Sequence, residues 1–142
     1  MDVEGCQSEW EEVVSSVLQG TVLGGLMFNV FIDDIDDVVE LFVRKFADDT
    51  KLAKIVESET DALGLQKDID ALAAWAQKWE MSFNIKKCKV MHVGRRNLRH
   101  QYVMGGIELE KVRQEKDLGI WTEESMKPAV QCEYAAKKVL PP

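Results

Sequence analysis

The sequence predicts an α+β fold, and three features carry that prediction. Two short apolar runs, 41–46 and 51–56, flank the adjacent acids Asp48 and Asp49. Aromatic and β-branched residues favour strands while aspartate favours turns, so the runs are expected to form an antiparallel hairpin with the two acids at its turn. A long amphipathic helix follows the hairpin, and further short strands follow the helix. Strands paired with near neighbours beside one long helix are typical of an α+β domain.

The chain before the hairpin is rich in glycine and acid. Residues 1–16 form a turn-rich stretch with Trp10 as a core contact, and three glycines, at positions 20, 24 and 25, weaken any helix near them. From Leu26 the apolar pattern predicts a buried helix that ends near the acidic run 33–37. That run lacks the alternating spacing and the glycine of a calcium loop, so it is interpreted as surface.

The helix is predicted over residues 60–80. Ser58 and Asp61 resemble a capping box in which the shorter aspartate replaces the usual glutamate or glutamine, and this favours a helix start at this point. Apolar residues then recur at steps of three and four along one face: Leu65, Ile69, Leu72, Ala76 and Trp79. Trp75 and Trp79 are interpreted as core anchors, rather than as a platform on which nucleic-acid bases stack.

Shorter elements follow this helix. Residues 89–94 alternate as a strand, with His92 on the same side as Val90. A basic loop leads to a hairpin over residues 102–109, which turns at Gly105-Gly106. Residues 117–121 are predicted to form one last strand and residues 126–140 a final helix broken near Pro128. His92 and His100 have no partner at metal-ligand spacing, so both are interpreted as surface or packed side chains.

Composition limits the classes of protein to which the chain can belong. A chain of 142 residues with 46% hydrophobic and 30% charged residues matches one ordinary globular domain. Its apolar runs are far shorter than the roughly 20 residues that cross a bilayer, so no membrane is expected as partner. The start of the chain is acidic, unlike a signal peptide, and the three widely spaced cysteines favour reduced thiols. An intracellular protein is therefore expected, and the sequence does not distinguish the nucleus from the cytoplasm.

Charge is distributed unevenly along the chain. The net charge of −7 argues against the whole chain acting as a free-standing nucleic-acid binder. Residues 86–113, however, contain eight basic and two acidic residues, a local balance of +6. Such a stretch either lies along phosphates or forms a solvated surface, and the sequence leaves both alternatives open.

The Asp48-Asp49 pair also has two interpretations. Adjacent ionised carboxylates repel each other, so the pair is either a solvated hairpin tip or a site for a hard cation such as Mg²⁺ or Mn²⁺. The pair alone favours the first interpretation, and its neighbours change the balance.

Five segments, taken in order, decide between them: 19–24, 26–35, 46–50 (Phe-Ala-Asp-Asp-Thr), 83–91 and 115–120. Together they resemble the reverse transcriptase of non-LTR (LINE-type) retrotransposons, over the C-terminal part of the palm domain and the start of the thumb. The resemblance runs from about residue 8 to residue 139. It implies a partial polymerase palm, an antiparallel sheet with helices on one face, within an incomplete right-hand architecture. Residues 1–100 would be the partial palm, and residues 101–142 a hairpin and the start of a thumb-like connection.

The resemblance implies an activity, RNA-directed DNA polymerisation. This nucleotidyl transfer joins a primer 3′-hydroxyl to a nucleotide with the help of two divalent ions. Asp48 and Asp49 would be catalytic residues that hold Mg²⁺ or Mn²⁺. An RNA template, a DNA primer and a dNTP would be the partners.

Four other residues take roles from the same resemblance. Gln19 and Gly20 match the loop along the incoming nucleotide and template, and Phe46 matches the residue beneath the primer end. Lys87 matches a position near the nucleotide phosphates, where it would assist the departing pyrophosphate as a third catalytic residue.

The sequence also departs from the family pattern. Ser16, Leu18 and Gly25 replace residues that are glycine or proline in the family, which should loosen the substrate loop. The family's upstream aspartate-bearing strand has no counterpart before residue 19, and Asp2 has no strand around it. The chain alone is therefore expected to be inactive, with weak metal binding.

An alternative hypothesis is a non-catalytic retrotransposon remnant that acts, if at all, as an interaction or nucleic-acid-associating module. Apolar residues such as Phe28, Phe31, Trp75 and Trp79 are expected to lack cover, and self-association through exposed apolar surface follows from that expectation.

Overall fold

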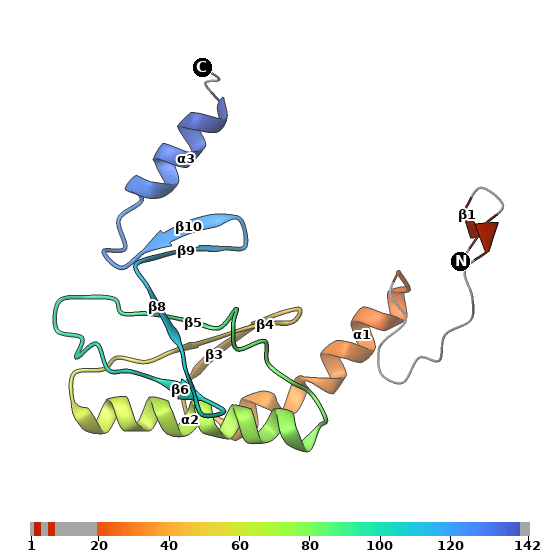
Figure 1. The fold of residues 1–142 in the computed structure, drawn as a ribbon, viewed down its shortest axis with the longest axis horizontal. Coiled ribbons are helices and arrows are strands. Elements are labelled where there is room, and N and C mark those ends of the chain that lie inside the picture. The colour runs from red at the N-terminus through yellow and green to blue at the C-terminus, as the bar shows by residue number, and fades with distance from the viewer. Residues whose placement is uncertain (1, 4–5, 8–19, 140–142) are drawn as a thin grey trace. The chain divides into compact units, whose positions relative to one another are not determined.

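The computed structural model describes residues 2–3, 6–7 and 20–139. The chain divides into two compact units, Met1–Asp33 and Asp34–Pro142. Most of the regular structure belongs to the second unit (Figure 1).

The described part of the first unit contains a small ladder and one helix. Strand β1 (Asp2–Val3) pairs antiparallel with β2 (Cys6–Gln7). Asp2 therefore lies in a strand, two residues long, where the sequence predicted none. The predicted core contact Trp10 and the substituted positions Ser16 and Leu18 lie outside the described residues.

Helix α1 (Val22–Phe31) begins earlier than the sequence predicted. Thr21 is its N-cap, and the Thr21 hydroxyl accepts a hydrogen bond from the backbone N–H of Gly24 at 3.1 Å. This cap satisfies an N–H that would otherwise have no partner, which offsets the cost of two glycines in the first turns. The side chains of Leu26 and Val30 are 58% and 70% exposed, so the prediction of a buried helix here was wrong.

The second unit begins with a 3₁₀ helix and the predicted hairpin. After η1 (Asp33–Val38), strand β3 (Phe42–Phe46) pairs antiparallel with β4 (Asp49–Ala53). Helix α2 (Glu59–Lys78) follows, within two residues of the bounds predicted from its periodicity. Figure 1 shows α2 running along one side of the strands, and it contacts β6 (Val103–Met104).

The core lies on one face of α2. Its buried side chains Ile69, Leu72 and Trp75 belong to the same core as residues of the surrounding loops and strands, among them Ile35, Val56, Tyr102, Met104 and Leu109. Trp75 is only 4% exposed, so the expectation that it lacks cover was wrong. Trp79, which caps the C-terminus of α2, is 39% exposed and is not the core anchor that was predicted.

The start of α2 is fixed by the predicted capping box. The backbone N–H of Asp61 donates to the Ser58 hydroxyl at 3.2 Å, and the backbone N–H of Ser58 donates to the Asp61 carboxylate at 2.9 Å. These bonds satisfy two N–H groups that the first turn leaves open. The Ser58 hydroxyl also donates to the Asp61 carboxylate at 2.6 Å. This bond, followed by the backbone N–H bonds to the same carboxylate, holds the pKa of Asp61 below its ordinary value.

Three side chains on α2 attach the rest of the unit to it. The Gln66 amide pairs with both backbone groups of Val103, donating to its carbonyl at 2.7 Å and accepting from its N–H at 2.9 Å. The Trp75 indole N–H donates to the Asp34 carboxylate at 2.9 Å, and Asp68 accepts from the backbone N–H of Glu40 at 3.3 Å. The acidic run is therefore only partly surface, because half-buried Asp34 anchors η1 to the helix.

The middle of the unit contains one parallel ladder and one tight hairpin. Strand β5 (Lys89–Met91) pairs parallel with β8 (Glu110–Val112). Between them, β6 pairs antiparallel with β7 (Ile107–Glu108) across Gly105-Gly106, as the sequence predicted. Both glycines have positive φ, 57° and 80°, which is the requirement of a two-residue hairpin turn.

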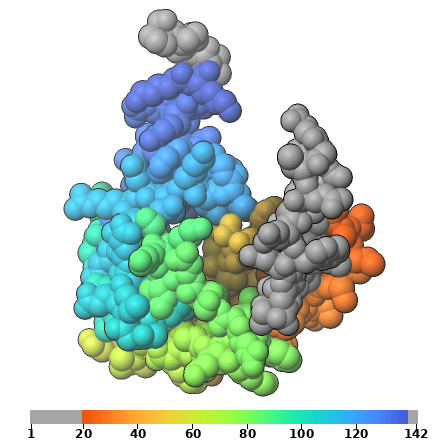
Figure 2. Space-filling view, turned by 45° about the vertical axis from the view of Figure 1, so that its right-hand side comes forward, coloured from red at the N-terminus to blue at the C-terminus, as the bar shows by residue number. Residues whose placement is uncertain are grey.

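The C-terminal part differs from its prediction. The single strand expected at 117–121 is instead a hairpin of β9 (Gln114–Asp117) and β10 (Ile120–Glu123). Leu118, with φ 46°, and Gly119, with φ 86°, form its turn. Helix α3 (Ala129–Val139) begins directly after Pro128 and lies next to this hairpin (Figures 1 and 2). The rings of Trp121 and Tyr134 stack with their centres 4.7 Å apart.

The described residues therefore form a mixed α+β structure, as predicted. Its strands, however, are arranged as five two-stranded ladders, four antiparallel and one parallel, rather than as one antiparallel sheet. Within the described ranges no helix is both long enough and apolar enough to span a bilayer.

Candidate functional site

The two acids lie at the tip of the β3–β4 hairpin. Phe46 pairs with Asp49, so the connection consists of Ala47 and Asp48 alone. Asp48 is therefore in the turn itself, and Asp49 is the first residue of β4. A two-residue turn on a paired ladder fixes both positions relative to the strands, as the sequence predicted.

Ala47 holds the turn in an unusual backbone conformation. Its φ is 51°, in the left-handed region that costs a residue with a Cβ atom about 1–2 kcal/mol. Two-residue hairpins require positive φ at the first central position, and glycine or asparagine usually occupies it. Strain of this kind at a chemically distinctive position is a pointer to function.

Paired residues of the hairpin share one face, and the outer face carries both aromatic and charged groups. Phe42, Arg44 and Phe46 on β3 are exposed, and so are their partners Ala53, Lys51 and Asp49 on β4. The Arg44 guanidinium lies 3.9 Å from the centre of the Phe42 ring. Lys51 forms an ion pair with Asp117 of β9. Asp49 is thus next to an exposed ring and within a strongly charged surface.

The opposite face packs more closely. Val43, Lys45 and Leu52 are half-buried, and the Lys45 ammonium lies 3.1 Å from the Asp36 carboxylate. The hairpin therefore has an inner face held by packing and by an ion pair, while its outer face and its tip remain open.

The carboxylates at the tip match the donor chemistry of Mg²⁺ or Mn²⁺. Both Asp48 and Asp49 are exposed, and hard divalent cations prefer carboxylate oxygens. Mg²⁺ commonly binds through one or two carboxylates, with water and substrate phosphates completing its shell. Among the described residues no group of three or more His, Cys, Asp or Glu side chains lies close enough to hold a metal. The pair therefore fits a metal only as part of such a shell.

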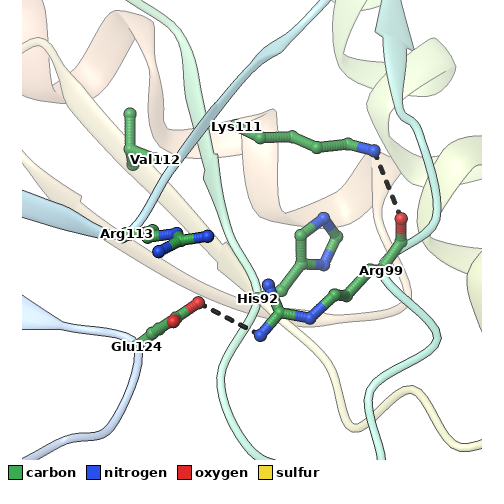
Figure 3. Close-up of a pocket in the computed structure, with 6 residues that line it drawn as sticks. All are labelled: His92, Arg99, Lys111, Val112, Arg113 and Glu124. Atoms are coloured by element: carbon green, nitrogen blue, oxygen red, sulfur yellow. Dashed lines mark hydrogen bonds and ion pairs between the residues drawn. The ribbon is translucent and has the colours of Figure 1, made fainter.

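A second feature, a small pocket, was not predicted from the sequence. Its volume is about 260 Å³, and its walls come from the loop before β6, from β8 and from the ends of β5 and β10 (Figure 3). Three of its residues are cations, and the full lining is His92, Arg99, Lys111, Val112, Arg113 and Glu124. All the cations come from the basic stretch 86–113, which the sequence left as either phosphate-binding or solvated surface.

His92 is the buried residue of this pocket. Its side chain is 5% exposed, and Figure 3 shows the imidazole between the Lys111 and Arg99 side chains. Burial lowers the pKa of His92, and the nearby charges of Lys111, Arg99 and His100 add to that effect. One hydrogen bond, from the ring to Asn97, opposes it. The interpretation of His92 as a packed side chain is confirmed. His100 is half-buried, edge-on to Tyr102 with ring centres 5.1 Å apart.

Residues 2–132 match the family model of reverse transcriptases (RNA-dependent DNA polymerases). The chain belongs to the reverse transcriptase family. The resemblance drawn from the sequence is therefore confirmed at the level of the family.

Two curated relatives of this reverse transcriptase chain are both called RNA-directed DNA polymerase from mobile element jockey. The protein from Drosophila melanogaster is 31% identical over 97 residues, which cover 62% of this chain and 11% of the relative. The protein from Drosophila funebris is 36% identical over 97 residues, which cover 60% of this chain and 10% of the relative. The chain thus spans about a tenth of the length of these relatives. No solved structure matches the chain.

The remaining predicted site residues of the reverse transcriptase chain belong to segments other than the β3–β4 hairpin. Lys87 is an exposed residue of the turn before β5, whose backbone N–H donates to Asn84 at 2.8 Å. Within the part of the chain that the structure describes, no hydrogen bond or ion pair joins Lys87 to Asp48. Gly20 precedes α1 with a φ of 82°, and a Cβ atom there would meet nothing within 4 Å. The glycine is therefore required by the backbone conformation and not by crowding. Gln19 lies outside the described residues.

Proposed function

We propose that this chain is part of the palm of a LINE-type reverse transcriptase, with RNA-directed DNA polymerisation as the parent activity. The observation that carries the proposal is the placement of Asp48 in the two-residue turn of the β3–β4 hairpin and of Asp49 directly after it. Membership of the reverse transcriptase family and similarity to jockey polymerases support it.

In this proposal each predicted residue has a role. Asp48 and Asp49 hold Mg²⁺ or Mn²⁺, which when bound assists displacement at the nucleotide α-phosphate. Exposed Phe46, paired with Asp49, supports the primer end. Lys87 offsets charge on the departing pyrophosphate, and Gln19 with Gly20 lies along the nucleotide and template.

We further propose that these residues alone do not polymerise. The two carboxylates of the tip are too few to bind a pair of ions tightly, and the chain spans only about a tenth of its jockey relatives. RNA template, DNA primer and dNTP would be bound jointly with the rest of a polymerase. Metal affinity on the order of millimolar is expected, as for other sites with few charged ligands.

Mn²⁺ titration tests the metal site directly. The enhancement of water proton relaxation reports Mn²⁺ bound to the chain without requiring catalysis. We expect the Asp48→Ala/Asp49→Ala double variant to lose the tightest binding. The matched control is Asp37→Ala/Glu108→Ala, which removes two exposed acids outside the hairpin and should leave that binding in place. Equal Mn²⁺ binding by the unmodified chain and the Asp48→Ala/Asp49→Ala variant would show that these two acids are not a metal site.

Primer extension tests the activity. On an RNA template with Mn²⁺, the unmodified chain should give no extension. Extension that disappears in the Asp48→Ala/Asp49→Ala variant would show instead that the chain is itself a polymerase. The alternative, a non-catalytic remnant, predicts neither extension nor metal binding at these acids.

A further inference from the structure

The proton on His92 can be placed from its hydrogen bonds. His92 Nδ1 lies 3.0 Å from Asn97 Oδ1, and the backbone N–H of Arg99 donates to the same Oδ1 at 2.9 Å. A backbone N–H only donates, so this amide atom is an oxygen and not the NH₂ nitrogen. A carbonyl oxygen only accepts, so Nδ1 must carry the proton that it shares with Asn97.

The other ring nitrogen is therefore an acceptor. Because burial lowers the pKa of His92, the ring is neutral at neutral pH and has a single proton, the one on Nδ1. Nε2 then presents a lone pair. It is buried, and among the described residues it has no hydrogen-bond partner. Buried polar atoms in folded proteins nearly always have a partner, so this nitrogen indicates a missing donor.

The surroundings of the ring select an anion. Arg99 is the one pocket cation with an acidic partner, since its guanidinium lies 3.2 Å from the Glu124 carboxylate. Within the described ranges neither Lys111 nor Arg113 is paired with a carboxylate. The Lys111 ammonium donates to the Arg99 carbonyl at 3.3 Å, and that single bond on an exposed side chain is easily exchanged for a ligand. Figure 3 shows the Lys111 side chain on one side of the imidazole, so displacement of this side chain would expose that side of the ring to a ligand.

The ligand must then supply two groups at once, an oxyanion for the cations and a hydroxyl donor for Nε2. The RNA backbone carries both on each nucleotide, a phosphodiester and a ribose 2′-hydroxyl, whereas DNA lacks the hydroxyl. A volume of about 260 Å³ suits a sugar-phosphate unit and is below the usual range of pockets for whole drug-sized ligands.

We propose that this pocket binds a ribose-phosphate unit of an RNA backbone, with the 2′-hydroxyl donating to His92 Nε2 and the phosphate held by Lys111 and Arg113. Exposed Arg95, three residues after His92, favours a polymer over a free ion, because a polymer can also reach cations outside the pocket. The site shares no residue with the Asp48-Asp49 tip, so it stands whether or not the chain binds metal.

The binding test varies the ligand first. Fluorescence anisotropy at low salt, without divalent metal, compares short single-stranded RNA with DNA and 2′-O-methyl RNA of the same sequence. One hydrogen bond predicts that RNA binds about fivefold more tightly than either analogue. Equal affinities for the three strands would overturn the proposal, and this arm requires no altered protein. Inorganic phosphate is added as a competitor, and displacement of RNA by phosphate at matched phosphate concentration would assign the pocket to the free ion instead.

Protein variants then test which residues are responsible for RNA binding. His92→Phe removes the acceptor, so RNA and DNA affinities should become equal, provided that circular dichroism shows the native fold. Arg113→Gln changes an exposed side chain and should weaken RNA and DNA binding alike. Lys127→Gln is the charge-matched control, because this exposed lysine lies outside the pocket, and it should change binding less. If Arg113→Gln and Lys127→Gln weaken binding equally, general charge and not the pocket accounts for it, and the proposal is wrong.

Discussion

At Ala47 the backbone adopts a conformation that disfavours any side chain. Its φ of 51° places the Cβ atom against the following carbonyl, a strain of about 1–2 kcal/mol that glycine avoids. Glycine also makes the unfolded chain more flexible, which removes part of the gain. We expect Ala47→Gly to raise the free energy of unfolding by about 1 kcal/mol, measured by urea denaturation.

Ala53 provides the matched control for that substitution. It lies in the same hairpin, at the end of β4, where φ is not positive. Ala53→Gly should lower stability by roughly 0.5–1 kcal/mol, because the flexibility of glycine is then uncompensated. Loss of stability in both variants would show that the Ala47 conformation is not strained.

His92 makes stability depend on pH in a predictable direction. Burial, then the charges of Lys111, Arg99 and His100, depress its pKa in the folded state, against the opposing bond from Asn97. Below the ordinary value of 6.5 the unfolded state takes up a proton that the folded state resists. The unfolded state binds more protons there, so stability is full above pH 6.5 and falls as the pH drops below it.

Urea denaturation at a series of pH values measures this effect. In His92→Phe the decline just below neutrality should be reduced, because the titrating group is gone. His100→Gln serves as the control, since it removes the other histidine of the chain and leaves His92 in place. A decline of the same size in His92→Phe would assign the pH dependence to other groups.

At the scale of elements, substitutions in the acidic run 33–37 test how η1 is attached to α2. Asp34 accepts the buried Trp75 indole N–H, whereas Asp37 in the same run is exposed. Asp34→Ala leaves that N–H without its acceptor, which should cost about 1–3 kcal/mol in the free energy of unfolding. Asp37→Ala removes the same charge and should stay within about 0.5 kcal/mol of the unmodified chain. Equal effects in thermal or urea unfolding would contradict the anchoring role of Asp34.

The elements that the sequence predicted well are those specified by near neighbours. The capping box places Ser58 and Asp61 three residues apart, and the Gly105-Gly106 turn provides its own backbone freedom. The β9–β10 hairpin was missed because Leu118 occupies a positive-φ position that glycine or asparagine usually fills. The signal that remained was Gly119 in the middle of the expected strand.

Features that depend on contacts between residues far apart in the sequence could not be predicted from it. The bond from Trp75 to Asp34 spans 41 residues, and the parallel pairing of β5 with β8 joins segments about twenty residues apart. Periodicity and turn chemistry report on neither. The same pairing places Lys111 beside His92, so the cations of the pocket were visible as a basic stretch while their convergence on one ring was not. Asp48 and Asp49, in contrast, were predictable because they are adjacent in the sequence, one in a short turn and the other directly after it.

At the scale of the whole molecule, charge and apolar exposure act in opposite directions. The net charge of −7 keeps chains apart by mutual repulsion. Many large apolar side chains are nevertheless exposed in the second unit, among them Ile55 at 82%, Phe46 at 63%, Ile120 at 57% and Leu118 at 56%. Two chains that bring such side chains together remove apolar surface from water, at about 25 cal/mol per Å².

We therefore expect the chain to self-associate, and to do so more strongly as salt screens the repulsion. Light scattering coupled to size-exclusion chromatography, across a wide range of protein concentration and at low and high salt, measures the mass. Ile55→Lys replaces the most exposed of these side chains with a charge and should shift the mass toward the monomer, whereas Thr60→Lys, at an exposed position of α2, adds the same charge and removes no large apolar group. A monomer mass of 16.1 kDa at every concentration and salt would show that the exposed side chains do not drive association.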